Sequence, residues 1–261
     1  MKRYLKLYLA FFKNCLVREM EFRAHFIMQN IIALAWAIIV MLTFFFIYQN
    51  VSTVHGWSLE QMLLLTAIYF LIDRIFDSFF EINFGNFITV VNTGQLDLIL
   101  TKPVSSQFFI SLRQFSFAML FSNFAMIGVI IYLVAHYFSP LSWLNLISFI
   151  ILIICSVIIT YSLWFMTLLP IFWLGRVDNL QHLFRPLHQL CRIPIDITGR
   201  FRFFLTYIIP LAFVATIPAK SLFNQLNYYL LFFGVIVSIF LLFLSHRLWR
   251  FCLKFYTSAS S

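Results

Sequence analysis

Long stretches without a single charged side chain constrain this sequence more than any other feature. Residues 26–48, 144–174 and 228–244 contain no Asp, Glu, Lys or Arg. A helix needs about 20 apolar residues to cross the hydrocarbon core of a bilayer. The chain is 62% hydrophobic and 10% charged, whereas roughly a quarter of the residues in soluble domains are charged. The sequence therefore predicts an all-α integral membrane protein without room for a separate soluble catalytic domain.

Six transmembrane helices fit the pattern of apolar segments. We expect spans one and two within 26–80 (26–48 and 63–80), spans three and four within 115–174 (115–137 and 144–174), and span six at 228–244. The intervening segment 178–224 mixes arginines and prolines with apolar residues, and such backbone survives at membrane depth only where protein or water covers it. We predict a short, polar fifth span at about 178–193, followed by an outer re-entrant helical hairpin. The alternative divides 144–174 into two spans and makes the next region an external loop.

The distribution of basic residues predicts which side of the membrane each segment faces. Residues 1–24 form an amphipathic helix on the cytoplasmic surface, whose apolar face carries Leu5, Leu9, Phe12, Leu16 and Met20. The basic residues expected in the cytoplasm are Lys2, Arg3, Lys6, Lys13, Arg18, Arg23, Lys102, Arg176, Arg247, Arg250 and Lys254. The loops at 49–58 and 138–142 contain no Lys or Arg. By the positive-inside rule both termini lie in the cytoplasm, including the tail at 245–261.

The net charge of +9 can be interpreted in two ways. In a soluble protein it would suggest nucleic acid, but in a membrane protein it reports topology and contact with anionic lipid. We expect membrane lipid as a partner and no nucleic acid. The four cysteines form no C-x-x-C pair or Cys/His cluster, so we expect neither a metal site nor a disulfide.

The cytoplasmic loop at 82–107 interrupts the apolar sequence with "NTGQLDLILTKPVSSQF". A short helix containing Phe87 and Val91 is expected to stop at Asn92–Gly94, and Lys102 and Pro103 turn the chain back to the membrane. Such a helix, packed on the cytoplasmic face, is what a transporter needs to receive force from a soluble motor. A plain loop between two spans is the other interpretation.

Three segments, in this order, resemble one group of type-2 ABC transporter permeases, the membrane subunits of bacterial export systems. "NTGQLDLILTKPVSSQF" resembles their G-E-L-D-x-x-L-x-[KR]-P-[VL]-S pattern, and "LVREMEFRAHFIMQN" resembles the E-x-x-x-R-x-N-F start of their first span. "RIPIDITGRFRFFLTYIIPLAFVATIPA" resembles the block before their last span. Gln95, His25 and Ile193 depart from these patterns.

The resemblance implies a six-span half-transporter in the bacterial inner membrane. It implies that a coupling helix contacts a nucleotide-binding ATPase subunit, which would carry ATP and Mg, and that a second permease, identical or paralogous, completes the pair. The predicted coupling residues are Phe87, Val91, Gly94, Asp97, Leu98, Lys102 and Pro103. The chain has no G-x-x-x-x-G-K-[ST] motif and no cofactor site, so ATP hydrolysis is expected on another polypeptide.

Asp73, Arg74 and Asp77 form a charged cluster within span two. Asp73 and Asp77 are four residues apart and Arg74 precedes Asp77 by three, so they can pair along one helix. Charges inside a membrane are costly and therefore suggest function. The cluster is either a neutralised group that fixes packing against another helix or a proton relay.

A second charged group lies in the predicted fifth span and hairpin: Arg185, His188, Arg192, Arg200 and Arg202. These residues could line a path for an acidic substrate, bind lipid phosphate, or pair with Asp178 and Asp196.

The leading hypothesis is the permease subunit of an ATP-driven exporter, with no catalytic residue of its own. A proton-coupled secondary transporter built on Asp73, Arg74 and Asp77 is the main alternative, and a non-transporting structural membrane subunit is another. An integral-membrane enzyme is disfavoured, because the chain contains no H-E-x-x-H or G-x-S-x-G motif.

Overall fold

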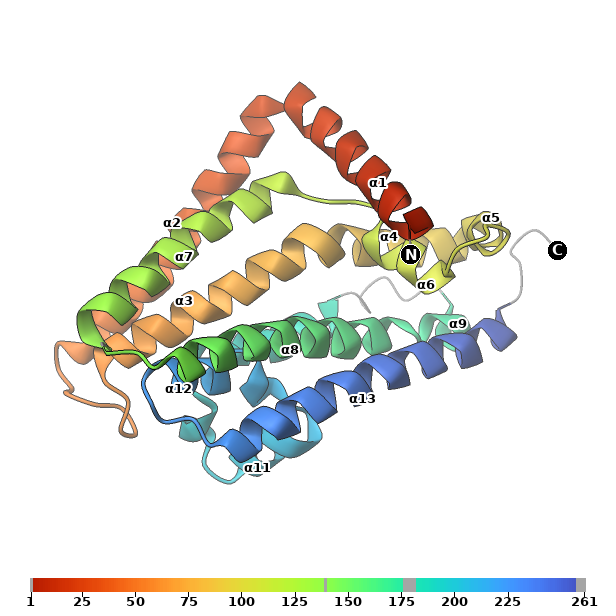
Figure 1. The fold of residues 1–261 in the computed structure, drawn as a ribbon. Coiled ribbons are helices and arrows are strands. Elements are labelled where there is room, and N and C mark those ends of the chain that lie inside the picture. Colours follow the sequence, from red (N-terminus) through yellow and green to blue (C-terminus); the bar gives the residue numbers. More distant parts are fainter. Residues whose placement is uncertain (1, 139, 176–181, 257–261) are drawn as a thin grey trace.

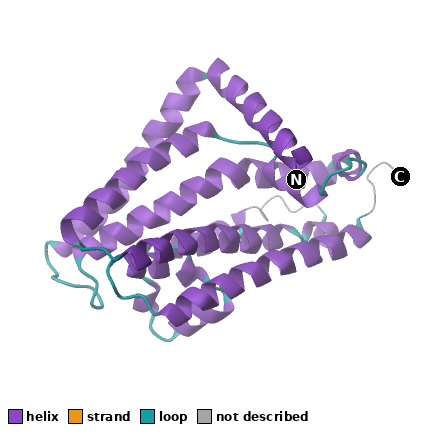
Figure 2. Cartoon of the chain, viewed as in Figure 1, coloured by secondary structure: helices purple, strands orange, loops and turns teal. Residues whose placement is uncertain are grey.

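The computed structural model describes residues 2–138, 140–175 and 182–256, and it is helical without strands in this part of the chain (Figure 2). The first half contains α1 (Lys2–Glu21), α2 (Arg23–Tyr48), α3 (Leu59–Phe76), the π-helix η1 (Asp77–Glu81), α4 (Ile82–Asn92), α5 (Gln95–Leu100), α6 (Ser106–Leu112) and α7 (Phe117–Tyr137). The second half contains α8 (Trp143–Leu168), α9 (Ile171–Leu174), α10 (Phe184–Gln189), η3 (Leu190–Arg192), η4 (Ile195–Thr198), α11 (Phe201–Phe203), η5 (Phe204–Ile208), η6 (Leu211–Phe213), α12 (Thr216–Leu222), α13 (Tyr228–Cys252) and η7 (Leu253–Phe255).

Five long helices, α2, α3, α7, α8 and α13, form the bundle (Figure 1). The start of α1, helices α4, α5, α6 and α9, and the end of α13 lie at one end of the bundle; α11, α12 and the loop after α2 lie at the other (Figure 1). The two ends of the described chain therefore share one side of the molecule. We call this side the inner end and the opposite side the outer end, following the predicted topology.

Four helical segments are long and apolar enough to cross a membrane in the described part of the chain: Arg23–Tyr48, Phe117–Tyr137, Trp143–Leu174 and Tyr228–Phe255. They match the predicted spans one, three, four and six. Helix α8 is continuous from Trp143 to Leu168, so the alternative that divided this run into two spans is wrong.

Helix α3 occupies the centre of the bundle. It begins at a capping box, in which the Ser58 hydroxyl accepts from the Gln61 backbone N–H and the Gln61 side chain accepts from the Ser58 N–H. Leu64, Leu65 and Ile68 are fully buried, although α3 also carries three charged residues. By contrast, only 11% of the residues in the most apolar 18-residue stretch of α2 are buried. An apolar helix with so little cover within its own chain has to face lipid or another protein.

The helix predicted as span two is longer than expected. Residues 76–82 keep right-handed helical backbone, so α3, η1 and α4 follow one another without a break from Leu59 to Asn92. The first part of the predicted loop at 82–107 is thus a helical extension of span two, because no proline interrupts it and the π-turn absorbs the change in register. The chain does turn at Gly94, which adopts φ 72° and, as a glycine, tolerates this left-handed conformation.

The structure describes only residues 182–193 of the predicted fifth span. There, α10 and η3 make one short helical stretch before Pro194. The residues from 194 to 222 form short helical pieces toward the outer end, as Figure 1 shows for α11 and α12. The six-span count and the re-entrant hairpin stay predictions.

Candidate functional site

The π-turn η1 holds a buried carboxylate at the centre of a charged cluster. Asp77, 4% exposed, opens this turn. Arg74 Nη1 lies 3.2 Å from Asp77 Oδ2, and Arg185 Nη2 lies 3.1 Å from Asp77 Oδ1. Arg185 also contacts Glu81 Oε1 at 2.5 Å. One arginine of α10 therefore joins the predicted fifth span to the second through two carboxylates, and the buried Asp77 has a cation beside each of its oxygens.

One helical turn before Asp77, within α3, a second set of contacts joins the same two segments. His188 is fully buried, and its Nδ1 lies 3.4 Å from Asp73 Oδ1. The Tyr69 hydroxyl lies 3.4 Å from the same carboxylate oxygen and 3.4 Å from His188 Nδ1. Arg192 lies over the Tyr69 ring at 5.4 Å and over the Trp36 ring of α2 at 5.6 Å, within cation–π range.

A third set of contacts lies at the outer end. Asp196 Oδ1 is 3.1 Å from Arg202 Nε, and Asp196 Oδ2 is 2.6 Å from Lys220 Nζ. The indole N–H of Trp57, just before α3, donates to Asp196 at 3.3 Å. This carboxylate ties helix α11, helix α12 and the loop after α2 together.

These contacts follow α3 in antiparallel order. Arg185 meets Asp77, His188 meets Asp73, Arg192 meets Tyr69, and Asp196 meets Trp57. The segment from Arg185 to Asp196 thus accompanies nearly the whole length of α3. Arg185, His188 and Arg192 of this segment contact side chains of α3 and η1.

The structure brings most of the predicted charged residues together. Asp73, Arg74 and Asp77 lie with Arg185 and His188, as the packing interpretation of this cluster expects. Arg202 pairs with Asp196, one of the two partners considered from sequence. Asp178 lies outside the described residues, and Arg200 is exposed at the outer end. Sequence reasoning missed Glu81, although its position four residues after Asp77 places both on one helix face.

The predicted coupling residues divide into a buried base and an exposed tip. Phe87 and Val91 of α4 are buried, and the Phe87 ring lies 5.9 Å from the ring of Trp249 in α13. In contrast, Leu98 of α5 is 68% exposed. Lys102 and Pro103 are also exposed. The short helix α5 therefore presents an uncovered leucine while α4 anchors it to the bundle.

Asp97 lies on the side of α5 that faces Tyr256, the last described residue of the chain. Burial raises the pKa of the Tyr256 phenol, and the Asp97 carboxylate raises it further. This carboxylate therefore faces the segment after α13 and helps to place α5 against it.

Helix α1 is fixed to the same end by a carboxylate. Glu19 accepts hydrogen bonds from the backbone N–H groups of Phe117, at 2.9 and 3.0 Å, and of Ala118, at 3.2 Å. Those donors open α7, where a negative charge is favourable. Glu19 begins the E-x-x-x-R pattern noted in the sequence, and its place in the fold gives that pattern a structural reason.

Comparison with known proteins gives one match. A family profile described as "ABC-2 family transporter protein" matches residues 34–260. Searches of curated proteins and of solved structures gave no match. The matched region contains α3 to α13 and therefore both the charged cluster and the exposed tip of α5.

Proposed function

The chain belongs to the ABC-2 family of transporter proteins, and from this premise we propose that it is the permease subunit of an ATP-driven export system. Permeases of this family generally work with an ATPase partner. The chain itself carries no P-loop motif. ATP and Mg would therefore bind a separate nucleotide-binding subunit, and this chain would form the translocation path without catalysing a reaction.

The exposed tip of α5 is the observation that carries the proposal. Leu98 is 68% exposed at the inner end of the bundle, beyond the long apolar helices. A lone exposed leucine needs no explanation by itself. Here it stands on a six-residue helix that Gly94 redirects from α4, and α4 is the continuation of the central helix α3. A push on α5 would be transmitted along α4 and α3 to the interior.

The transport cycle follows from this connection. Closure of the ATPase dimer would shift the inner ends of the spans, and the bundle would alternate between two arrangements whose populations depend on nucleotide. The contacts between α3 and residues 185–196 would move with α3, so this charged segment is the part of the path most directly linked to the ATPase.

The remaining parts of the proposal concern topology and assembly. We place six crossings in a bacterial inner membrane with both termini in the cytoplasm. The antiparallel order of contacts between α3 and residues 185–196 supports a fifth crossing made of a broken helix. A second permease, identical or paralogous, would complete the transporter, and Arg200 and Arg202 would lie near its outer opening.

A proton-coupled secondary transporter is the second candidate, because Asp73, His188 and Tyr69 touch one another inside the bundle. The pairing of Asp77 with two arginines favours a packing role for the wider cluster. Uptake or efflux by the purified protein, driven by a pH gradient without ATP, would support this candidate against the first.

The first experiment is purification of the tagged protein from membranes of its own host in mild detergent, with mass spectrometry of the proteins that co-elute. We expect a stoichiometric P-loop ATPase, and a second permease in the same peak if the pair is heteromeric. Leu98→Asp and the double variant Asp97→Ala/Leu98→Ala should each lose the ATPase.

The matched control is Leu174→Asp. Leu174 is 61% exposed in α9, at the same end of the bundle, so this variant adds the same charge away from α5. A wild-type protein that elutes without an ATPase, or equal retention by Leu98→Asp and Leu174→Asp, would contradict the proposed coupling surface.

A further inference from the structure

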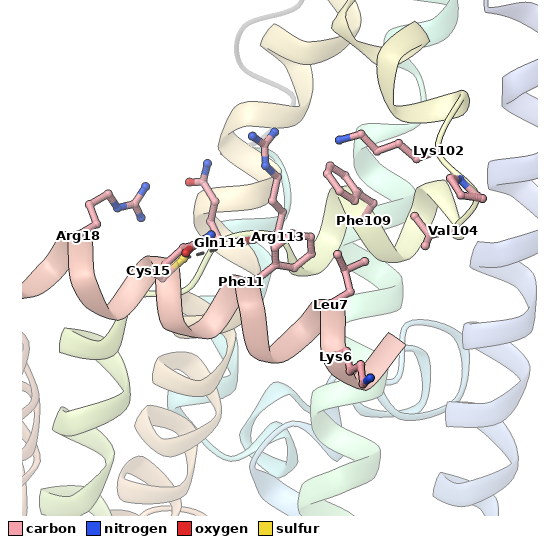
Figure 3. Close-up of a pocket in the computed structure, with 12 residues that line it drawn as sticks. Lys6, Leu7, Phe11, Cys15, Arg18, Lys102, Val104, Phe109, Arg113 and Gln114 are labelled. Carbon is pink, nitrogen blue, oxygen red and sulfur yellow. Dashed lines mark hydrogen bonds between the residues drawn. The ribbon is translucent and has the colours of Figure 1, made fainter. Parts of the chain in front are cut away.

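A groove at the inner end lies between α1, the segment after α5 and helix α6 (Figure 3). Its volume is about 790 Å³. Four cationic side chains from three separate segments contribute to its lining: Lys6 and Arg18 from α1, Lys102 after α5, and Arg113 after α6. Figure 3 shows Arg18, Arg113 and Lys102 on one side of the ribbon of α1.

No acidic residue lines this groove in the described part of the chain, and none of the four cations forms an ion pair there. Glu19, the neighbour of Arg18, is occupied at the start of α7. The Phe109 ring lies beneath two of the cations, 4.1 Å from Lys102 Nζ and 5.5 Å from the Arg113 guanidinium. Like charges held around one hollow repel one another, so the groove favours an anion.

The position of α1 indicates which anion is available. Its outward face carries Leu9, Leu16 and Met20, which are 57%, 40% and 55% exposed. An amphipathic helix with such a face and basic flanks lies at the level of the lipid headgroups. The groove is on the protein-facing side of the same helix, and Leu7, Phe11 and Val104 supply it with apolar walls. A phosphate next to an apolar surface is the chemistry of a phospholipid.

We propose that this groove binds the headgroup phosphate of an anionic phospholipid in the inner leaflet. General basic excess explains attraction to a membrane surface, but the position of Arg18, Lys102 and Arg113, from three segments, on one side of α1 describes a discrete site. Guanidinium and ammonium groups form strong charge-assisted hydrogen bonds with phosphate oxygens. The bound headgroup would bridge α1 to the segment that follows α5.

This bridge gives the lipid a regulatory role, which rests on the proposed function. Lys102 and Pro103 follow α5 closely in the chain. An anion bound between Lys102 and Arg18 would therefore restrain α5. Transport coupled to ATP should therefore depend on the content of anionic lipid.

Photo-crosslinking tests the site without any ATPase, so its failure would leave the proposed function untouched. The full chain is reconstituted in phosphatidylcholine vesicles that contain photoactivatable phosphatidylglycerol or, at equal mole fraction, photoactivatable phosphatidylcholine. Crosslinked peptides are mapped by mass spectrometry. We expect the phosphatidylglycerol probe to label peptides around Arg18 and Arg113, and the phosphatidylcholine probe to label them far less.

The test variant is Arg18→Gln/Lys102→Gln/Arg113→Gln, and the matched control is Arg247→Gln/Arg250→Gln/Lys254→Gln. The control removes three cations from another surface at the inner end of α13. Each basic residue near an anionic surface contributes roughly a fivefold gain in affinity, so the test variant should lose at least about tenfold of the labelling while the control keeps most of it. Both proteins must retain the thermal unfolding midpoint of the wild type; if the triple variant falls short, the single Arg113→Gln variant replaces it.

Three results would overturn the proposal. Equal labelling by the two probes would remove the preference for an anionic headgroup, and unchanged labelling of the test variant would remove the site. Displacement of the phosphatidylglycerol probe by millimolar inorganic phosphate would assign the groove to a soluble anion.

Discussion

Glu19 shows how one side chain can connect two distant parts of this chain. Its carboxylate accepts three hydrogen bonds from the first turn of α7, 98 or 99 residues away in sequence. Glu19→Ala removes both the cap and the charge, so we expect a loss of about 1 kcal/mol of stability. In a chain of this size that lowers the unfolding midpoint by roughly 2–4 °C, measured in mild detergent.

The control for this prediction stands two residues further along the same helix. Glu21 is exposed and has no hydrogen bond or ion pair in the described part of the chain, so Glu21→Ala should leave the midpoint nearly unchanged. Equal effects of the two substitutions would mean that the loss reflects charge alone and not the cap of α7.

The contact between Asp77 and Arg185 permits a stricter test, because its energy can be separated from the cost of each substitution. Asp77→Asn and Arg185→Gln should each destabilise the protein, and the double variant should lose less than the sum. For residues in direct contact at 3.1 Å we expect a coupling energy of about 1–2 kcal/mol. The measurement is the free energy of unfolding in mixed micelles across the double-mutant cycle.

Arg200 provides the comparison. It is exposed, and none of the described ion pairs includes it, so the cycle of Asp77→Asn with Arg200→Gln should be additive to within about 0.5 kcal/mol. A coupling energy near zero for Asp77 and Arg185 would contradict the contact between α3 and α10.

At the scale of helices, α13 packs so closely on η6 that only glycine fits at position 234. A Cβ on Gly234 would lie 2.6 Å from Cε1 of Phe213, whose side chain is fully buried and has little room to move. We expect Gly234→Ala to destabilise the protein by about 1–3 kcal/mol. Gly128→Ala in α7 has the opposite expectation, because nothing lies within 4 Å of its Cβ and alanine stabilises a helix interior by about 0.5–1 kcal/mol. The measurement is the thermal unfolding midpoint of each variant. A midpoint that shifts in the same direction for both variants would contradict the close packing of Gly234 on Phe213.

The same scale separates what the sequence could and could not predict. The apolar spans were predictable because hydropathy is a local property. Helices α2 and α7 match the predicted spans within three residues, the apolar segment Trp143–Leu174 matches span four, and α13 begins where span six was predicted but continues beyond residue 244 to Cys252. The stop at Gly94 was predictable for the same reason, since glycine marks a left-handed turn. The continuation of span two through η1 was missed, because a π-turn has no sequence pattern of its own. The partners of Arg185 could not be chosen, since they depend on which helices pack together: sequence offered Asp178 and Asp196, and the fold supplies Asp77 and Glu81.

At the scale of the whole molecule, the proposed fifth crossing depends on how residues 184–196 lie along α3. The helical stretch from Phe184 to Arg192 rises only about 14 Å, too short for a bilayer core of roughly 30 Å. Ile193 and Pro194 have extended backbone, which adds about 3.3 Å per residue, and this lengthens the path from His188 to Asp196. The contacts with Asp73 and Trp57 at its two ends require this path. A crossing of this kind would escape a hydropathy search, because the segment carries Arg185, His188 and Arg192, which contact α3 and η1 instead of lipid.

Single cysteines introduced at exposed positions and treated with a membrane-impermeant thiol reagent test this topology. The four native cysteines are buried and should stay unlabelled in the folded protein. Ser52→Cys and Arg200→Cys should react in intact cells, whereas Gln95→Cys, Leu174→Cys and Lys254→Cys should react only after the membrane is opened. The decisive comparison is between Leu174→Cys and Arg200→Cys. If the two cysteines are labelled from opposite sides of the membrane, the chain must cross the membrane between them; if they are labelled from the same side, there is no fifth crossing. In that second case the charged segment would lie outside the bilayer, and Arg185 could not meet Asp77 at membrane depth, so this labelling result and the double-mutant cycle must agree.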